Sequence, residues 1–339
     1  MTDIPLPQVG AAQPIVELDH ISKRFTRKLD VAEKIANLLG ANRRETTVHA
    51  VDGVSFSIKK GEVVGLVGES GCGKSTLGRV VANIHSPSYG TLKYRGKSIS
   101  EMSKEEKRDY TLNTQMIFQD PMSSLNPRMR VREIIGEAPK VHGLTTGGYD
   151  DFVDEIMLKV GLDPAYKKRF PHQFSGGQRQ RIGIARALAV NPELIVCDES
   201  VAALDVSIQA QVLNLFMKLR ADLDLTYLFI SHDLGVVEHI SDRVVIMYLG
   251  RVVESARTQE LFDHPNHPYT QALLKEVPRI NTGRKVFEPI KGEIPSPINP
   301  PKGCHFHPRC PMAHERCRIE IPGMKAIGNN HISACHLND

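Results

Sequence analysis

The stretch Gly68-Glu-Ser-Gly-Cys-Gly-Lys-Ser-Thr76 decides the fold of this chain. It follows an apolar run, Val63–Val67, and precedes a segment of helix-forming composition, which is the strand–loop–helix setting of the motif G-x-x-x-x-G-K-S/T. Glycines let backbone N–H groups approach a phosphate without interference from a Cβ atom, and the N-terminus of the following helix favours negative charge. The stretch therefore predicts that the chain binds a nucleoside triphosphate.

Each residue type in this loop has its own chemical role. Lys74 is placed to reach the β- and γ-phosphates, and the Ser75 hydroxyl is placed to bind Mg²⁺. A glycine-rich turn alone is more often structural, but a Lys and a Ser directly after it favour nucleotide binding. The other residues expected to contact the nucleotide are Gly68, Ser70, Gly71, Cys72, Gly73 and Thr76.

Composition and charge exclude several other classes of protein. The chain has 339 residues, 41% of them hydrophobic and 24% charged, which is typical of a soluble globular protein of about two domains. A net charge of +4 gives no case for nucleic-acid binding, and no apolar run approaches the ~18 residues that span a bilayer. Residues 1–13 lack the apolar core of a secretory signal, so we expect a disordered lead-in there.

Apolar runs alternate with helical periodicity along most of the chain, which predicts an α/β core around a parallel sheet. Residues 121–192 have mostly helical patterns and are interpreted as an inserted helical subdomain. Pro and Gly then become frequent, so we expect a nucleotide-binding domain at 14–270 and a separately organised tail at 271–339. Strands are predicted at 16–21, 51–58, 62–68, 91–95, 114–118, 194–197, 227–230 and 243–249, and helices at 29–39, from the loop to about 85, and at 207–223.

Two further motifs have the chemistry of nucleotide hydrolysis. Asp198 and Glu199 follow the buried strand Leu194–Cys197. Asp198 is suited to hold Mg²⁺ through water, and Glu199 to orient or deprotonate an attacking water, although an acidic pair could also merely cap the next helix. Ser175-Gly-Gly-Gln178, which precedes a long helical segment, is more specific because it builds a second anion-accepting helix N-terminus.

With these motifs, the chain resembles the ATPase subunits of ABC transporters over about residues 15–339. The resemblance implies a P-loop α/β core of the ABC ATPase type, a helical subdomain that carries the signature motif, and a β subdomain. It also implies a Pro/Gly- and Cys-rich C-terminal tail. Ser175, Gly176, Gly177 and Gln178 match the signature motif, Asp205 matches the end of the D-loop, and His232 matches the switch histidine.

Two more positions take a role only from this resemblance. Gln119 matches the Q-loop residue, which in the family contacts Mg²⁺ and faces the membrane subunits. Phe25 lies where the family stacks an aromatic ring on adenine, although a lone aromatic residue after a strand is more often part of the core. Two positions depart from the family pattern: Ser200 replaces the usual Pro and Ala202 the usual Ser. Hydrolysis is expected to survive both, while the missing Ala202 hydroxyl puts the D-loop contacts in question.

Longer segments narrow the resemblance to the oligopeptide/dipeptide importer branch. They are Phe118-Gln-Asp-Pro-Met-Ser-Ser-Leu-Asn-Pro127, Asp205-Val-Ser-Ile-Gln-Ala-Gln211, His267-Pro-Tyr-Thr270 and Gly292-Glu-Ile-Pro-Ser-Pro297. Asn126-Pro-Arg128 and Leu194-Ile-Val-Cys197 are most similar to the F-type ATPase of that branch. The implied function is ATP hydrolysis that powers import of peptides or related solutes, at the cytoplasmic face of the inner membrane.

The chain contains one phosphate loop and one signature motif, which in the family act on opposite faces of a head-to-tail dimer. The implied partners are two transmembrane permease subunits, a sister ATPase or a second copy of this chain, and indirectly an extracytoplasmic solute-binding protein. No nucleic acid is implied. The alternative is a soluble ABC ATPase of translation or DNA repair, although those usually have two phosphate loops or long coiled coils. A small-molecule kinase is the third candidate function, and the signature motif argues against it.

Two segments lie outside the nucleotide motifs. Leu29–Leu39 has helical spacing, and we interpret it as an exposed amphipathic helix that packs on its own domain, with a surface contact to a partner or the membrane as the alternative. Four of the six cysteines, Cys304, Cys310, Cys317 and Cys335, lie near the C-terminus. Because a cytoplasmic protein rarely keeps disulfides, this cluster predicts a metal site.

The identity of that metal is left open by the residues themselves. Four thiolates suit either tetrahedral zinc or an iron–sulfur cluster. The wide gaps between the cysteines weigh against zinc, while the nearby His305, His307, His314 and His336 weigh for it. Peptide-importer tails, which this tail resembles, hold a 4Fe–4S cluster. A structural 4Fe–4S cluster is therefore expected, with zinc and reduced free thiols as alternatives.

Overall fold

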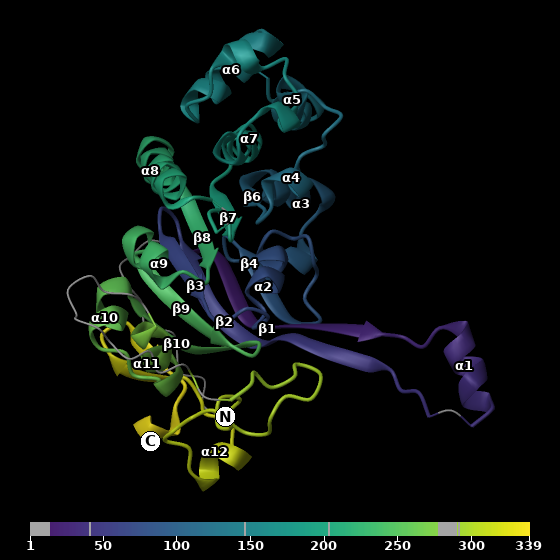
Figure 1. Cartoon of the computed structure of the whole chain (residues 1–339), viewed down its shortest axis with the longest axis vertical. Helices are drawn as coiled ribbons and strands as arrows, with labels where there is room; N and C mark the ends of the chain where they lie inside the picture. The colour runs from purple at the N-terminus through teal and green to yellow at the C-terminus, as the bar shows by residue number, and fades with distance from the viewer. Residues whose placement is uncertain (1–13, 41, 146, 203, 277–289, 291) are drawn as a thin grey trace.

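The computed structural model describes residues 14–40, 42–145, 147–202, 204–276, 290 and 292–339, so the expected lead-in at 1–13 lies outside the described residues. Two sheets organise the described chain (Figure 1). One has eight strands in the order β11-β12-β10-β9-β3-β8-β7-β6, and the other has four in the order β2-β1-β4-β5. The smaller sheet includes β4 (Tyr89–Tyr94) and β5 (Lys97–Ser98), and α3 (Lys104–Asn113) leads from it into the larger sheet.

The centre of the larger sheet is parallel. β3 (Val63–Val67) pairs with both β8 (Thr226–Ser231) and β9 (Arg243–Tyr248), and β7 (Leu194–Asp198) lies between β8 and β6 (Thr114–Ile117). All residues of β3, β7 and β8 are buried, as continuous apolar runs predict for strands covered on both faces. The carboxyl ends of β3 and β7 therefore lie at one edge of the sheet, where ligands bind in open α/β folds.

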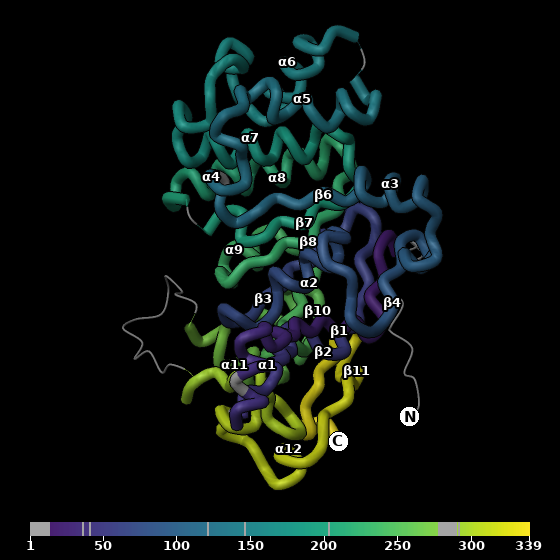
Figure 2. The backbone as a smooth tube through the Cα atoms, turned by 90° about the vertical axis from the view of Figure 1, so that its right-hand side faces the viewer, coloured from purple at the N-terminus to yellow at the C-terminus, as the bar shows by residue number. Residues whose placement is uncertain are grey.

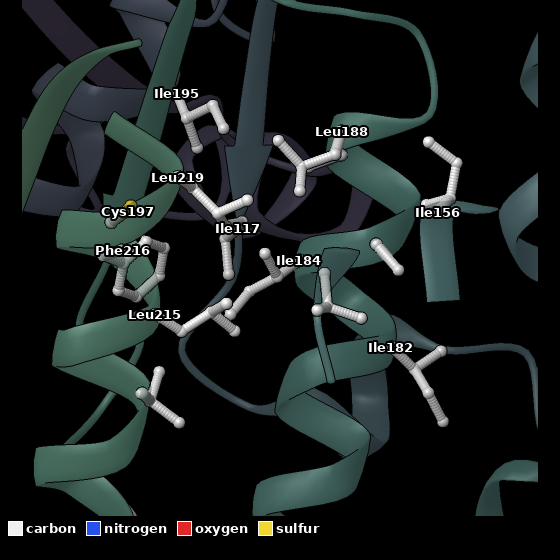
Figure 3. Close-up of a cluster of buried hydrophobic side chains, with 14 of the residues drawn as sticks. Ile117, Ile156, Ile182, Ile184, Leu188, Ile195, Cys197, Leu215, Phe216 and Leu219 are labelled. Atoms are coloured by element: carbon white, nitrogen blue, oxygen red, sulfur yellow. The ribbon is translucent and has the colours of Figure 1, made fainter. Parts of the chain in front are cut away.

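Four helices lie between β6 and β7 in the chain: α4 (Pro121–Ser124), α5 (Val131–His142), α6 (Tyr149–Lys159) and α7 (Gly176–Leu188). α5, α6 and α7 form one end of the molecule (Figure 1). α8 (Val206–Leu223) joins them to the sheet. Figure 3 shows Ile184 of α7 directed toward Leu215 of α8 and Ile117 of β6. This shared apolar core holds α7 at a fixed position relative to the sheet.

β1 (Pro14–Arg27) and β2 (Thr46–Lys59) form an arm that extends from the body of the protein (Figure 1). They pair as far as Arg27 and Thr46, and α1 (Val31–Leu38) lies at the tip. The side chains on its apolar face are largely exposed: Val31 73%, Ile35 53%, Leu38 86% and Leu39 85%. The predicted exposure of this helix is confirmed, but the prediction that it packs on its own domain is wrong, because the paired strands carry it away from the body.

The C-terminal region joins the larger sheet. It is preceded in the chain by α9 (Leu234–Ile240), β10 (Arg251–Arg257), α10 (Thr258–Asp263) and α11 (Pro268–Lys275). It contains α12 (Glu315–Ile319), β11 (Lys325–Gly328) and β12 (His331–Ser333). β12 pairs with β10, opposing Ser333 to Glu254. His331 Nε2 lies 2.7 Å from a carboxylate oxygen of the fully buried Glu254. The expectation of a separately organised tail is wrong for this part of the chain, since β12 and β11 extend the larger sheet beyond β10. Figure 2 shows the end of the chain, in yellow, at the lower end of the molecule.

Candidate functional site

The phosphate loop connects β3 to α2 (Lys74–Val81) and requires glycine at two positions. Gly73 has φ +105°, and a Cβ there would lie 2.0 Å from the carbonyl oxygen of Ala50. A Cβ on Gly68 would lie 2.2 Å from the carbonyl oxygen of Met247. The Lys74 ammonium donates to the carbonyls of Gly68 and Glu69, at 2.7 and 3.0 Å. The lysine is thus held inside the turn, where a bound phosphate would lie.

The loop opens into a pocket of about 360 Å³ that is lined by most of the phosphate-loop residues predicted to contact the nucleotide. The Cys72 side chain is buried in the core beneath the loop, and burial raises the pKa of its thiol. Of Cys72, only the backbone is therefore available to a nucleotide. The lining residues are Phe25, Val48, Ala50, Ser70, Gly71, Gly73, Lys74, Ser75, Thr76, Gln119, Glu199 and Pro297.

Ser75 and Asp198 meet beside this pocket. The Ser75 hydroxyl donates to an Asp198 carboxylate oxygen at 2.7 Å, and burial raises the pKa of Asp198 above its usual value. A hydroxyl and a carboxylate presented together fit the oxygen ligands that Mg²⁺ prefers, and a cation there would offset the desolvation of Asp198. The Gln119 amide lies at the same pocket and offers another oxygen.

Glu199 lies at the pocket wall between two polar partners. Gln119 Nε2 donates to one carboxylate oxygen at 2.6 Å, and His232 Nδ1 lies 3.4 Å from the other. Glu199 also has φ +46°, an uncommon conformation for a residue with a side chain, and such outliers cluster at functional sites. The structure thus brings Gln119, Glu199 and His232 together beside the phosphate loop.

Phe25 lies at the other side of the pocket. It opposes Val48 in the β1–β2 ladder, is 40% exposed, and contacts His85 edge-on with ring centroids 5.6 Å apart. The ring is therefore not a core side chain, which was the alternative reading of this residue, and its partial exposure leaves it free to stack on a planar base.

The signature residues lie apart from this pocket. Ser175 caps α7, and its hydroxyl accepts from the Gln178 N–H at 3.3 Å. Residues 175–178 are exposed or half-buried, and none of them is among the described residues that line the pocket. Asp205 is exposed at the N-terminus of α8, Ala202 is exposed, and Ser200 is buried. The chain therefore presents an anion-accepting helix N-terminus that its own phosphate loop does not use.

The four C-terminal cysteines line one small cavity together with His307 and His336. Burial raises the pKa of Cys304 to about 11, and the neighbouring thiols add to this effect. His305 instead contacts the carbonyl of Leu249, at 3.0 Å, outside that cavity. Within the described ranges, no three His, Cys, Asp or Glu side chains are arranged as a site for a single metal ion.

Sequence reasoning missed several residues at the nucleotide pocket. Val48 and Ala50 lie on β2, and their spacing of two residues places both side chains on one face, which is a signal the sequence contained. Pro297 comes from the C-terminal region, and its carbonyl accepts from the His49 N–H at 2.9 Å. Nothing in the local sequence indicates this contact.

Comparisons with known proteins agree with this geometry. Residues 51–202 match the family model for ABC transporters, and 253–317 match that for the C-terminal region of oligopeptide/dipeptide transporters. The chain is 54% identical to the oligopeptide transport ATP-binding protein AppF of Bacillus subtilis, over 96% of this chain and 98% of AppF. It is 48% identical to the dipeptide transport ATP-binding protein DppF of Haemophilus influenzae, over 85% and 89%.

Solved structures share the fold. CbiO1 of Clostridium perfringens, part of an ABC transporter complex, aligns with a TM-score of 0.60 at 24% identity, over 74% of this chain and 92% of CbiO1. The ATP-binding cassette MJ0796, solved as a dimer with ADP and phosphate, aligns with a TM-score of 0.59 at 25% identity, over 72% and 98%. The predicted P-loop α/β fold of the ABC ATPase type is confirmed. No helix of the described residues is long and apolar enough to cross a membrane.

Proposed function

Because the chain belongs to the ATP-binding subunits of oligopeptide/dipeptide ABC transporters, we propose that its pocket binds Mg²⁺-ATP and hydrolyses it to power peptide import. The observation that carries the proposal is the convergence of Glu199, Gln119 and the Ser75–Asp198 pair on the phosphate loop. Those groups, from three separate segments of the chain, are the ones that hydrolysis requires.

The reaction then depends on charge and position. The loop N–H groups and Lys74 neutralise the negative charge of the phosphates, and Phe25 stacks on the base. Ser75, Gln119 and Asp198 would hold Mg²⁺, which would supply further neutralisation of the charge on the γ-phosphate. Glu199 accepts hydrogen bonds from an attacking water or takes its proton. His232, whose Nδ1 lies 3.4 Å from a Glu199 carboxylate oxygen, bridges that water to the γ-phosphate.

A second ATPase subunit completes the site. The signature residues 175–178 and Asp205 are exposed and do not line the chain's own pocket, so they serve the phosphate loop of a partner, which serves this one in return. We propose a sister subunit as that partner, with a second copy of this chain as the alternative. Two transmembrane permease subunits complete the importer at the inner face of the membrane, and an extracytoplasmic solute-binding protein delivers the solute.

The Q-loop region supports coupling to the permeases. Gln119 contacts Glu199 at 2.6 Å, and Arg186 of the signature helix α7 donates to the carbonyl of Ser124 at 2.5 Å. A displacement of residues 119–124 by ATP is thus transmitted to the helical subdomain. A soluble ABC ATPase of translation or DNA repair is not favoured, because the relatives are peptide-transport subunits over nearly their whole length.

Reconstituted transport tests the proposal. The chain is co-expressed with its permeases and sister ATPase, purified as a complex, and placed in vesicles with the solute-binding protein outside. ATP inside is expected to drive peptide uptake, and Lys74→Ala is expected to abolish both uptake and ATP hydrolysis. Co-purification with ribosomes or DNA instead of permeases would contradict the proposal.

For the C-terminal cysteines we propose a structural 4Fe–4S cluster. Cys304, Cys310, Cys317 and Cys335 are four thiols around one cavity, which is the donor set such a cluster uses. When bound, the cluster would close the C-terminal region on itself.

Anaerobic purification distinguishes the alternatives. The proposal predicts a brown protein with about four iron and four acid-labile sulfide per chain, and Cys310→Ser is expected to remove the colour. Cys197→Ser is the matched control, because Cys197 is buried in β7 away from the cavity. A colourless protein with one zinc per chain would overturn the cluster, and one with neither metal would leave reduced thiols.

A further inference from the structure

We propose that Arg309 of the C-terminal region is a positioning residue of the ATP site, which fixes the phosphate loop through Glu69 and thereby sets ATP affinity. Glu69 is the second residue of the phosphate loop, and Arg309 lies 240 positions later in the chain. The inference rests on the proposed ATP-binding function and assigns part of it to the C-terminal region.

The contact is bidentate and enclosed. The two terminal nitrogens of Arg309 donate to the two carboxylate oxygens of Glu69, at 2.6 and 3.0 Å. The Arg309 side chain is 5% exposed and that of Glu69 22% exposed. The hydrogen bonds that Arg309 donates to Glu69 also raise the pKa of Arg309, so this guanidinium remains charged. The hydrogen bonds of a bidentate, mostly buried pair are stronger and more specific in geometry than those of a surface ion pair.

Glu69 is held at three points. Its carboxylate is bound by Arg309, its N–H donates to the Tyr269 hydroxyl at 2.9 Å, and its carbonyl accepts from the Lys74 ammonium at 3.0 Å. Two of these partners come from beyond β10, and the third is the residue that must reach the phosphates. The same glutamate therefore links the C-terminal region to the position of Lys74.

The partners of Glu69 are themselves rigid. Tyr269, Tyr248 and Phe306 form a buried aromatic cluster with ring centroids 4.7 to 5.3 Å apart. Arg309 lies against this cluster, with a terminal nitrogen 3.5 Å from the Tyr248 hydroxyl, and its own N–H donates to the carbonyl of Phe306. Arg309 is thus a fixed anchor, and loop order before ATP arrives lowers the entropy cost of binding.

Without Arg309, the Glu69 carboxylate would be an unpaired, mostly buried negative charge within the loop that binds the triphosphate. It would repel the phosphates and compete for Lys74, which already contacts the Glu69 carbonyl. Both effects weaken ATP binding and act on the ground state and the transition state alike, so KM is expected to rise with kcat little changed. A role limited to fold stability would not produce this split.

A double-mutant cycle tests the proposal on the full chain, in the complex with its sister ATPase. ATP affinity is measured by calorimetry, and kcat and KM by phosphate release, for wild type, Arg309→Gln, Glu69→Gln and the double variant. Arg309→Gln is expected to raise the Kd for ATP on the order of tenfold. The same change made in the Glu69→Gln background is expected to alter the Kd by less than about twofold, because the carboxylate it neutralises is gone.

Arg243→Gln is the matched control. Arg243 makes a similar bidentate, mostly buried pair with Glu62, at 2.8 and 3.3 Å, and it begins β9 at the edge opposite the phosphate loop. It is expected to lower the melting temperature without changing the Kd for ATP. Arg309→Lys keeps the positive charge but loses the bidentate geometry of the guanidinium, so an intermediate Kd for ATP is expected. This variant tests the proposal if Arg309→Gln fails to fold.

The outcomes are distinct. The inference is overturned if Arg309→Gln folds and has the Kd and KM of the wild type. If only Arg309→Lys folds, the same result for that variant overturns it. So does an equal effect in the Glu69→Gln background, since Arg309 would then not act through Glu69. Failure of the wild-type complex to bind ATP at all would instead overturn the proposed function.

Discussion

Replacing Glu199 with Gln separates ATP binding from hydrolysis. The Gln119 amide donates to a Glu199 carboxylate oxygen at 2.6 Å, and a glutamine carbonyl accepts the same hydrogen bond, so the wall of the pocket is preserved. What disappears is the negative charge and the capacity to take a proton from water. We therefore expect unchanged ATP affinity and a much slower chemical step.

The size of the effect follows from this single lost role. A positioned acid or base group contributes roughly 10²–10⁴-fold to a rate, which corresponds to about 3–5 kcal/mol of barrier. Phosphate release by the assembled complex measures kcat, and size exclusion with ATP detects the closed dimer, which is expected to accumulate because hydrolysis no longer releases it.

The matched control is Glu193→Gln. Glu193 precedes β7 at the end opposite Glu199 and pairs with Arg95, at 2.5 Å, so its loss is expected to leave kcat unchanged. Near-normal hydrolysis by the Glu199→Gln complex would refute the assignment of Glu199. A loss of ATP binding equal to the loss of turnover would show that Glu199 organises the pocket and does not act on water.

Three further outcomes are expected. In the wild type, Mg²⁺ affinity should rise with pH, because burial raises the pKa of Asp198 and the carboxylate binds Mg²⁺ only after it loses its proton. Asp198→Asn should weaken Mg²⁺ binding and remove this pH dependence, which Mg²⁺ titrations at several pH values measure. Burial lowers the pKa of His267 to about 4, so the folded state favours the neutral ring. The free energy of unfolding, measured with urea, should therefore fall by up to about 3 kcal/mol as the pH decreases from 6.5 to 4. The decrease should be smaller in His267→Gln. His331→Leu leaves the fully buried Glu254 without its ionisable partner and should cost about 3–5 kcal/mol of unfolding free energy, largely recovered in the Glu254→Gln, His331→Leu double variant.

The sequence predicted the nucleotide pocket because its groups lie in short motifs with a fixed local geometry. Gly68 to Thr76 must turn between a strand and a helix, and Asp198 and Glu199 must leave the end of a buried strand. Strands of one parallel sheet present their carboxyl ends at one edge, so these motifs meet without further information. Phe25 required the resemblance to a family, since nothing in its neighbours distinguishes it from a core residue.

The remaining features depend on pairing across the chain. Arg309 meets Glu69 across 240 residues, and β12 joins β10 across more than 70; no local periodicity encodes either contact. The α1 helix was predicted, but its place at the end of the β1–β2 arm was not, because that place depends on how far the two strands pair beyond their apolar residues. Helix α3 was missed because it is polar, although Ser103 and Glu106 form a capping box that marks its start.

The central claim is that the ATP site of this chain is completed by a second ATPase subunit. The most direct measurement is specific ATPase activity as a function of added sister subunit, at a chain concentration low enough to prevent self-association. The account predicts little hydrolysis by the chain alone and a rise that saturates at one sister subunit per chain, absent when the sister carries a disrupted signature motif. Full, concentration-independent turnover by the monomeric chain would contradict it.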